Sequence, residues 1–170
     1  YAATKYATEG IAMAYYETYG LDIRIARIFS IYGENMRRFF IYDIIKKLIL
    51  SDGTIFLKGS GNQQRDYLHI DDVVEGLIKI SRHGRPGEFY NLCSGRPTKL
   101  KKLTSLIQKI LNKENIEIIW DKKETKGIRD IWYGNNNKIT KLGFKPKKSF
   151  EESLESTVKA ISKKILISNR

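Results

Sequence analysis

The sequence contains one cysteine, two histidines and no long apolar run, and each scarcity argues against a class of protein. A single cysteine, Cys93, cannot form an internal disulfide, so it is expected as a small buried group in a reducing compartment, the cytoplasm. No run of about 20 consecutive apolar residues is present, so no membrane partner is predicted. Histidine, cysteine and carboxylate residues do not fall at metal-ligand spacings, so no metal site is predicted.

Acidic residues are also scarce relative to basic ones. The 31 lysines and arginines outnumber the 19 aspartates and glutamates, giving a formal net charge of +12. Such a surface attracts polyanions, whether nucleic acid, anionic membrane or phosphorylated small molecules. The lysines are spread from Lys46 to Lys164 rather than gathered in one arm, which equally fits a generally basic surface, and no nucleic-acid partner is predicted. A non-catalytic polyanion-binding module remains the alternative from another functional class.

Helical and strand patterns alternate along the 170 residues, of which 41% are hydrophobic. Helices are predicted over residues 2–19, 38–50, 73–81, 98–111 and 137–142 and from 149 onwards, and strands over 21–29, 54–58, 88–92 and 116–120. Asp71 or Asp72 is the expected N-cap of the third helix and Thr98 of the fourth, while Ser149 and Glu152 have capping-box spacing. This alternation predicts an α/β chain with parallel strand pairing.

Tyr1 and Lys5 stand four residues apart at the start of the first predicted helix, so they share one helical face. An ammonium beside a phenol favours the phenolate and lowers a tyrosine pKa from about 10 towards neutrality. The pair is therefore suited to proton transfer. The same spacing also arises by chance, and a solvated lysine beside a capping aromatic is the alternative from spacing alone.

Four further motifs follow this Y-x-x-x-K pair in order. They are residues 27–33 (RIFSIYG), 59–73 (G-x-G-x-Q-x-R-D-Y-x-H-x-D-D-V), 89–95 (FYNLCSG) and 142–146 (LGFKP). With these five motifs, the chain resembles the C-terminal half of extended short-chain dehydrogenases/reductases, the NAD-dependent nucleotide-sugar epimerase/dehydratase family.

The resemblance implies the C-terminal part of a Rossmann-like doubly wound domain plus a smaller α/β substrate-binding domain. Residues 1–35 would end the cofactor domain, and residues 36–170 would form mainly the substrate-binding cap, with segment 65–95 returning to the core. In the family, the glycine-rich dinucleotide fingerprint and the catalytic Ser/Thr lie upstream of the Y-x-x-x-K helix. The chain is therefore expected to be the second half of a longer enzyme and inactive alone.

The resemblance also implies roles in the reaction. Tyr1 would be the general acid/base for a sugar hydroxyl while hydride moves between the sugar C4 and a nicotinamide. Lys5 would bind the nicotinamide ribose and favour the phenolate, and the backbone of Phe29, Ser30 and Ile31 would line the nicotinamide. The cofactor is NAD or NADP, with NAD favoured.

The expected substrate is a nucleotide-diphosphate sugar. Arg65 would bind the diphosphate, since a guanidinium is a two-pronged donor, and its alternative role is an ion pair with Asp66 or Asp71. Ser30 stands where the family often carries Asn and retains a hydroxyl donor. The Asn35 loop and the start of the helix at Arg38 would offer backbone N–H groups to the phosphates.

Three further predictions complete the site. Phe56, in the strand predicted over 54–58, would contact the nucleobase, and Arg129 would be a second phosphate or ribose contact. His69 is predicted to be a hydrogen-bonded spacer rather than a base. The expected activity is that of an epimerase/dehydratase, with a GDP-4-keto-6-deoxyhexose-type reductase as the alternative, and a homodimer is expected through the Y-x-x-x-K helix.

Overall fold

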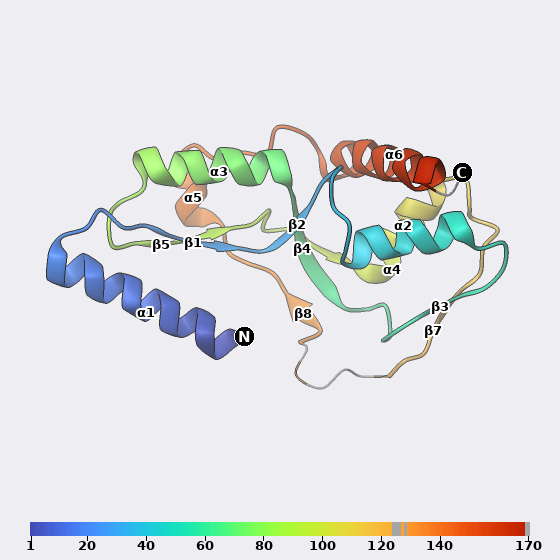
Figure 1. Ribbon diagram of the computed structural model, residues 1–170, viewed down its shortest axis with the longest axis horizontal. Helices are drawn as coiled ribbons and strands as arrows, with labels where there is room; N and C mark the ends of the chain where they lie inside the picture. Colours follow the sequence, from blue (N-terminus) through green and yellow to red (C-terminus); the bar gives the residue numbers. More distant parts are fainter. Residues whose placement is uncertain (124–126, 128, 169–170) are drawn as a thin grey trace.

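Figure 1 shows the computed structural model of the chain, which describes residues 1–123, 127 and 129–168. Its helices are α1 (Ala2–Tyr19), α2 (Phe40–Leu50), α3 (Ile70–His83), α4 (Leu100–Ile110), α5 (Asn137–Lys141) and α6 (Phe150–Ser168). Its strands are β1 (Ile25–Ile28), β2 (Ser30–Tyr32), β3 (Ile55–Leu57), β4 (Gln64–His69), β5 (Phe89–Leu92), β6 (Pro97–Lys99), β7 (Ile118–Trp120) and β8 (Ile131–Trp132).

The strands pair mainly in parallel. β1 pairs with β5, β2 with β4, and β3 with β7, all in parallel. β4 also pairs antiparallel with β6 and parallel with β8. These pairings confirm the predicted α/β class. β4, β6 and β8 are not predicted from the sequence. β4 has no alternation of polar and apolar residues, and strands of three and two residues are too short to show it.

The strand predicted over residues 21–29 is shorter than expected and continues, after a break, as a second strand. Phe29 forms the break, and its N–H donates to the Leu92 carbonyl at 3.2 Å. β1 pairs with β5 whereas β2 pairs with β4, so the chain changes partner at Phe29. The sequence does not reveal this change, because both strands belong to one continuous, mainly apolar run.

The N-cap predicted for α3 is wrong. His69, rather than Asp71 or Asp72, caps the helix, because its Nδ1 accepts from the Asp71 N–H at 3.3 Å. The buried Asp72 carboxylate instead accepts from the backbone N–H of Lys147 at 3.0 Å. Asp72 therefore fastens the segment before α6 to the first turn of α3.

Thr98 is not an N-cap either, because it lies in β6 opposite Arg65 and α4 begins at Leu100 with no side-chain cap. The capping box at the start of α6 is confirmed. Ser149 Oγ accepts from the Glu152 N–H at 3.2 Å, and the Glu152 carboxylate accepts from the Ser149 N–H at 2.8 Å. Each of these caps satisfies a backbone donor that the helix leaves unpaired.

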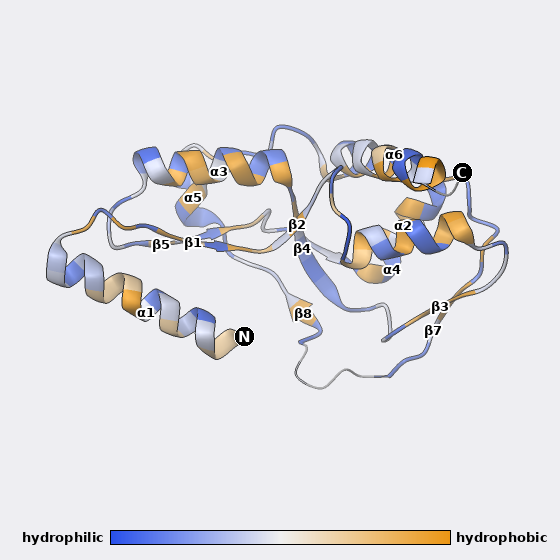
Figure 2. Cartoon of the chain, in the orientation of Figure 1, coloured by the Kyte–Doolittle hydropathy of each residue, from blue (hydrophilic) through white to orange (hydrophobic). Residues whose placement is uncertain are grey.

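Buried apolar residues form two clusters. Figure 2 shows hydrophobic positions on the helices at both ends of the molecule, on α3 at one end and on α2 at the other. The larger lies among α2, α4, α6 and β3 and includes Ile44, Ile45, Leu48, Ile55, Leu103, Ile107, Leu154 and Ile161. The smaller lies among α3, β5 and α5 and includes Leu68, Val73, Ile80, Tyr90, Leu92, Ile139 and Phe144. Most of the smaller cluster comes from segment 65–95, but Ile139 and Phe144 show that a later segment joins it. The domain boundaries at 35 and 36 stay a prediction.

Helix α1 stands apart from both clusters. It has no buried residue, and Figure 1 shows it on the far side of β1 and β5 from α3. An ion pair between Glu9 and Arg27, with N–O distances of 2.8 and 2.6 Å, ties the helix to β1. Among the described residues, no helix is both long and apolar enough to cross a membrane.

Candidate functional site

Tyr1 and Lys5 lie on one face at the open end of α1. Lys5 Nζ lies 5.8 Å from the centroid of the Tyr1 ring, and the Lys5 N–H donates to the Tyr1 carbonyl at 3.0 Å. Tyr1 is 93% exposed, so the rest of the described chain leaves its phenol open. In Figure 1 this end of the helix points towards the middle of the molecule, on the side where β8 lies. The shared face is the one the spacing predicts.

The predicted cofactor contacts Phe29, Ser30 and Ile31 lie where the chain leaves β1 and enters β2. Ser30 pairs with Tyr67 of β4, and Phe29 is held by the carbonyl of Leu92 at the end of β5. The carboxyl ends of the parallel strands β1 and β5 therefore meet at this point. Ligands of α/β proteins bind at such strand ends, where neighbouring strands diverge.

Asp66 is a buried carboxylate that joins β4 to the segment after β5. It is 0% exposed, and its Oδ1 accepts from both the N–H and the hydroxyl of Ser94 at 2.7 Å. Its Oδ2 accepts from the Gly95 N–H at 2.9 Å and from the Gly134 N–H at 3.4 Å. A carboxylate this deeply buried requires such partners, so Asp66 serves the fold.

Arg65 is held by backbone carbonyls alone. Its Nη1 donates to the carbonyls of Gln64, at 2.7 Å, and Asp130, at 3.1 Å. In the part of the chain that the structure describes, no carboxylate lies within ion-pair distance of Arg65, so the alternative pairing with Asp66 or Asp71 is wrong. With respect to the described residues, the guanidinium keeps an uncompensated positive charge, as an anion-binding residue requires.

A cavity of about 550 Å³ lies at the turn between β2 and α2, lined by residues 31–39 and Ile70. Arg37 and Arg38 line it, and the Arg38 guanidinium lies 4.8 Å from the centroid of the Phe39 ring. Phe39 has φ 74°, a conformation that non-glycine residues rarely adopt and that is concentrated at ligand sites. The sequence predicted phosphate contacts from the backbone at Arg38, where a helix was expected to start, but assigned no role to the side chains of Arg37 and Arg38. The adjacent arginines beside the 27–33 motif were the available signal.

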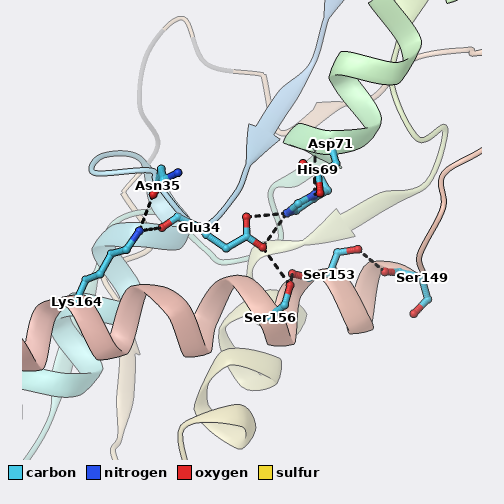
Figure 3. A network of polar contacts seen from close by, with 8 residues as sticks. All are labelled: Glu34, Asn35, His69, Asp71, Ser149, Ser153, Ser156 and Lys164. Carbon is cyan, nitrogen blue, oxygen red and sulfur yellow. Dashed lines mark hydrogen bonds and ion pairs between the residues drawn. The ribbon is translucent and has the colours of Figure 1, made fainter.

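Asn35 belongs to the same turn and is fixed by α6. Its Oδ1 accepts from Lys164 Nζ at 2.6 Å (Figure 3). The neighbouring Glu34 carboxylate lies 3.2 Å from His69 Nε2 and accepts from the Ser156 hydroxyl at 3.2 Å. Partial burial acts to raise the pKa of Glu34, but hydrogen bonds and the nearby His69 outweigh it and hold that pKa below its usual value. His69 is hydrogen bonded, as predicted.

The remaining predicted contacts lie elsewhere. Phe56 is 66% exposed on β3, beside a cavity of about 600 Å³ that α2 also lines. Figure 1 places β3 at the opposite end of the molecule from α1, so only an extended ligand reaches both. Arg129 is exposed in the segment before β8. The carbonyl of the next residue, Asp130, accepts a hydrogen bond from Arg65 at 3.1 Å, so the segment that carries Arg129 lies beside Arg65.

Neither Cys93 nor any acidic cluster adds a reactive centre. Cys93 is buried, and burial followed by the nearby Asp66 carboxylate raises the pKa of its thiol to about 12. The thiol is therefore protonated at neutral pH and is not a nucleophile. Over the described ranges, no three His, Cys, Asp or Glu side chains are grouped to hold a metal ion.

Residues 1–93, more than half of the 170-residue chain, match the NAD dependent epimerase/dehydratase family. The chain belongs to this family. The match contains the Tyr1–Lys5 pair, the partner change at Phe29, Arg65 and the turn that carries Asn35. The family and the fold expected from the five sequence motifs are thereby confirmed.

The chain is also similar to individual proteins over nearly its whole length. The chain is 34% identical over 156 residues to an uncharacterized protein of Methanocaldococcus jannaschii, covering 91% of this chain and 47% of that protein. A dTDP-glucose 4,6-dehydratase of Streptomyces venezuelae, solved with NAD bound, has a TM-score of 0.82 and 30% identity over 96% of this chain and 51% of its own. A UDP-glucose 4-epimerase of Thermotoga maritima, solved with UDP-glucose, has a TM-score of 0.87 and 26% identity over 97% of this chain and 54% of its own. The chain therefore spans about half the length of these relatives.

Proposed function

We propose that the chain supplies the acid/base pair and the substrate side of a nucleotide-diphospho-sugar epimerase/dehydratase. The observation that carries the proposal is the pairing of Tyr1 and Lys5 on one open helical face. Family membership and the similarity to a dehydratase and a 4-epimerase support it. NAD is favoured as cofactor over NADP, in line with the NAD bound to the dehydratase.

The residues of this chain fit one end of a dinucleotide. An exposed phenol and ammonium on α1 and the carboxyl end of β1 suit the nicotinamide and its ribose. No glycine-rich fingerprint occurs in the sequence, so this chain alone lacks the usual means of holding the pyrophosphate. The chemistry that NAD supplies when bound is the reversible acceptance of a hydride.

Tyr1 is the residue that transfers the proton. Its phenolate takes the proton of the sugar C4 hydroxyl as the C–H bond is oxidised, and its phenol returns a proton on reduction. Lys5 provides the positive charge that favours the phenolate, and its three ammonium donors suit the hydroxyls of a ribose. The backbone of Phe29, Ser30 and Ile31 would border the ring.

The substrate contacts follow from charge and donors. Arg65 binds the diphosphate, since its guanidinium has no carboxylate partner in the described structure, and the Ser30 hydroxyl and the turn at Asn35 add donors. Arg37 and Arg38 extend the positive charge along that turn. Phe56 takes the nucleobase and Arg129 a second phosphate or ribose, expectations that rest on the family resemblance.

The test of the proposal is Tyr1→Phe in the full-length native polypeptide. Turnover of a nucleotide-diphosphate sugar should fall by about 10²–10⁴, because general acid/base catalysis contributes that much, while NAD binding is retained. Tyr6→Phe is the matched control, since Tyr6 is an exposed tyrosine of the same helix. Wild-type rates in Tyr1→Phe contradict the proposal.

A reductase acting on a GDP-4-keto-6-deoxyhexose is the second candidate. Two stretches of the sequence favour it, because they resemble GDP-sugar reductases and dehydratases. They are residues 90–95 (YNLCSG) and 130–138 (DIWYGNNNK). The two activities differ in their electron balance. A reductase consumes one reduced nicotinamide per product, whereas an epimerase or dehydratase returns its hydride and consumes none.

A further inference from the structure

The turn between β2 and α2 is held by two elements that lie far from it in sequence (Figure 3). Glu34 and Asn35 form the turn, His69 ends β4, and Ser156 and Lys164 belong to α6. Ser156 and Lys164 are eight residues apart, about two helical turns, so both lie on the face of α6 that meets the turn. The contacts with α6 therefore fix the position of the turn.

The hydrogen bonds at His69 define how the turn is held on its other side. His69 is 5% exposed, and its Nδ1 accepts from the Asp71 N–H, so its Nε2 carries the proton and donates to the Glu34 carboxylate. The Tyr32 ring packs edge-on against the imidazole with centroids 5.3 Å apart. Glu34 is thus fixed by a buried ring from β4 and a hydroxyl from α6.

Lys164 determines which atom of the Asn35 side-chain amide can bind a ligand. Its ammonium donates to the Glu34 carbonyl at 2.9 Å and to the Asn35 side chain at 2.6 Å. An ammonium has donors only, so the atom that faces it is the amide oxygen. Among the residues that the structure describes, the amide nitrogen has no hydrogen-bond acceptor, and Figure 3 shows it directed away from Lys164.

The free end of Asn35 is therefore a donor in a basic setting. Asn35 lines the cavity with Arg37 and Arg38, and it lines a second cavity of about 540 Å³ together with Arg37, Lys46 and Lys164. Phosphate oxygens accept hydrogen bonds and do not donate them, so an NH₂ group suits them and an amide oxygen repels them. If the Asn35 side-chain amide were rotated by half a turn, it would present its oxygen to the phosphate instead of its nitrogen.

We infer that Lys164 is a positioning residue that orients the Asn35 amide as a hydrogen-bond donor to the diphosphate of the substrate. The inference rests on the proposed function, because it assigns one phosphate contact of that site. Glu34, held by His69 and Ser156, fixes the backbone of the turn from which this donor projects.

The test is a binding cycle in the full-length native polypeptide, with UDP and dTDP as probes. Lys164→Met should weaken nucleotide binding about five- to tenfold, since one hydrogen bond of about 1 kcal/mol is lost. Lys164→Arg, which keeps a donor-only cation, should restore most of the affinity. Lys163→Met makes the same change of charge one residue earlier, on an exposed side chain of α6, and should leave binding unchanged.

The decisive comparison places Lys164→Met in an Asn35→Ala background. If Lys164 acts through Asn35, its loss has no further effect there. An equal loss of affinity in both backgrounds, or none in either, overturns the inference and leaves the proposed function standing. If the wild-type protein binds neither probe, GDP is used in their place. A wild-type protein that binds none of UDP, dTDP and GDP overturns the proposed function itself, and the inference with it, before any variant is compared.

Discussion

At the scale of single residues, the sequence identifies side chains whose neighbours are close in the chain. Tyr1 and Lys5 share a face because helical geometry alone brings positions four apart together. Lys164 and Asn35 meet across 129 positions, and no local pattern pairs them. Arg37 and Arg38 were visible in the sequence, but their side chains had no assigned role until the cavity at the turn gave them one.

Asp66 shows why a residue's neighbour in sequence is a poor guide to its partner. Strand alternation places Asp66 on the face opposite Arg65, where it turns into the protein and meets backbone N–H groups instead of the guanidinium. The predicted alternative for Arg65 failed for this reason, and the failure leaves the arginine available to a phosphate.

Asp66→Asn should destabilise the native protein by about 3 kcal/mol. The amide keeps one acceptor, while its NH₂ group faces backbone donors and leaves buried groups unsatisfied. The measurement is the urea unfolding midpoint, compared with that of Asp52→Asn, which removes the charge of an exposed aspartate. A loss no larger than that of the control contradicts the role given to Asp66.

At the scale of elements, periodicity predicted the helices better than the strands. The helices from 2–19 and 38–50 appear within two residues of their predicted bounds, since each carries several turns of pattern. The strand predicted over 21–29 divides between two sheets at Phe29, and β8 has only two residues. Pairing of this kind depends on segments that lie far away along the chain, as for Ile25 with Phe89 and Ser30 with Tyr67.

The cap of α3 illustrates the same limit. Asp71 and Asp72 have the composition of an N-cap, yet the imidazole of His69 already accepts the first free N–H of the helix. Asp72 is then used by the segment before α6. Tertiary contacts therefore decided between three chemically suitable residues.

Helix α1 has an exposed apolar surface that is typical of a protein–protein interface. Tyr6, Ile11, Tyr15 and Tyr19 are all exposed apolar side chains on it, and the homodimer proposed through this helix would cover part of them. The native polypeptide should sediment as a dimer, and Ile11→Glu should shift it to a monomer by placing a charge in the interface.

The matched control for that dimer is Ile167→Glu, which introduces the same charge at an exposed position of α6. It should leave the dimer intact. A native protein that sediments as a monomer, or an Ile11→Glu variant that remains dimeric, counts against the role given to α1.

At the scale of the whole molecule, two apolar clusters are joined by β2 and β4, and the candidate site follows that junction. The Tyr1–Lys5 pair lies on α1, apart from both clusters, Phe56 lies on β3 beside the larger cluster, and Arg65 lies on β4. Such a layout suits a long ligand with a sugar at one end and a base at the other. The net charge of +12 fits the diphosphate in its middle.

The proposed reaction is the conversion of a nucleotide-diphosphate sugar at C4 without net consumption of the cofactor. It is tested most directly by NMR analysis of the products formed from UDP-, dTDP- and GDP-glucose by the full-length native polypeptide with NAD. We expect a C4-inverted or 4-keto sugar and no accumulation of NADH. No conversion of any of the three sugars, together with tight and steeply salt-dependent nucleic-acid binding, would contradict it and favour the polyanion-binding alternative.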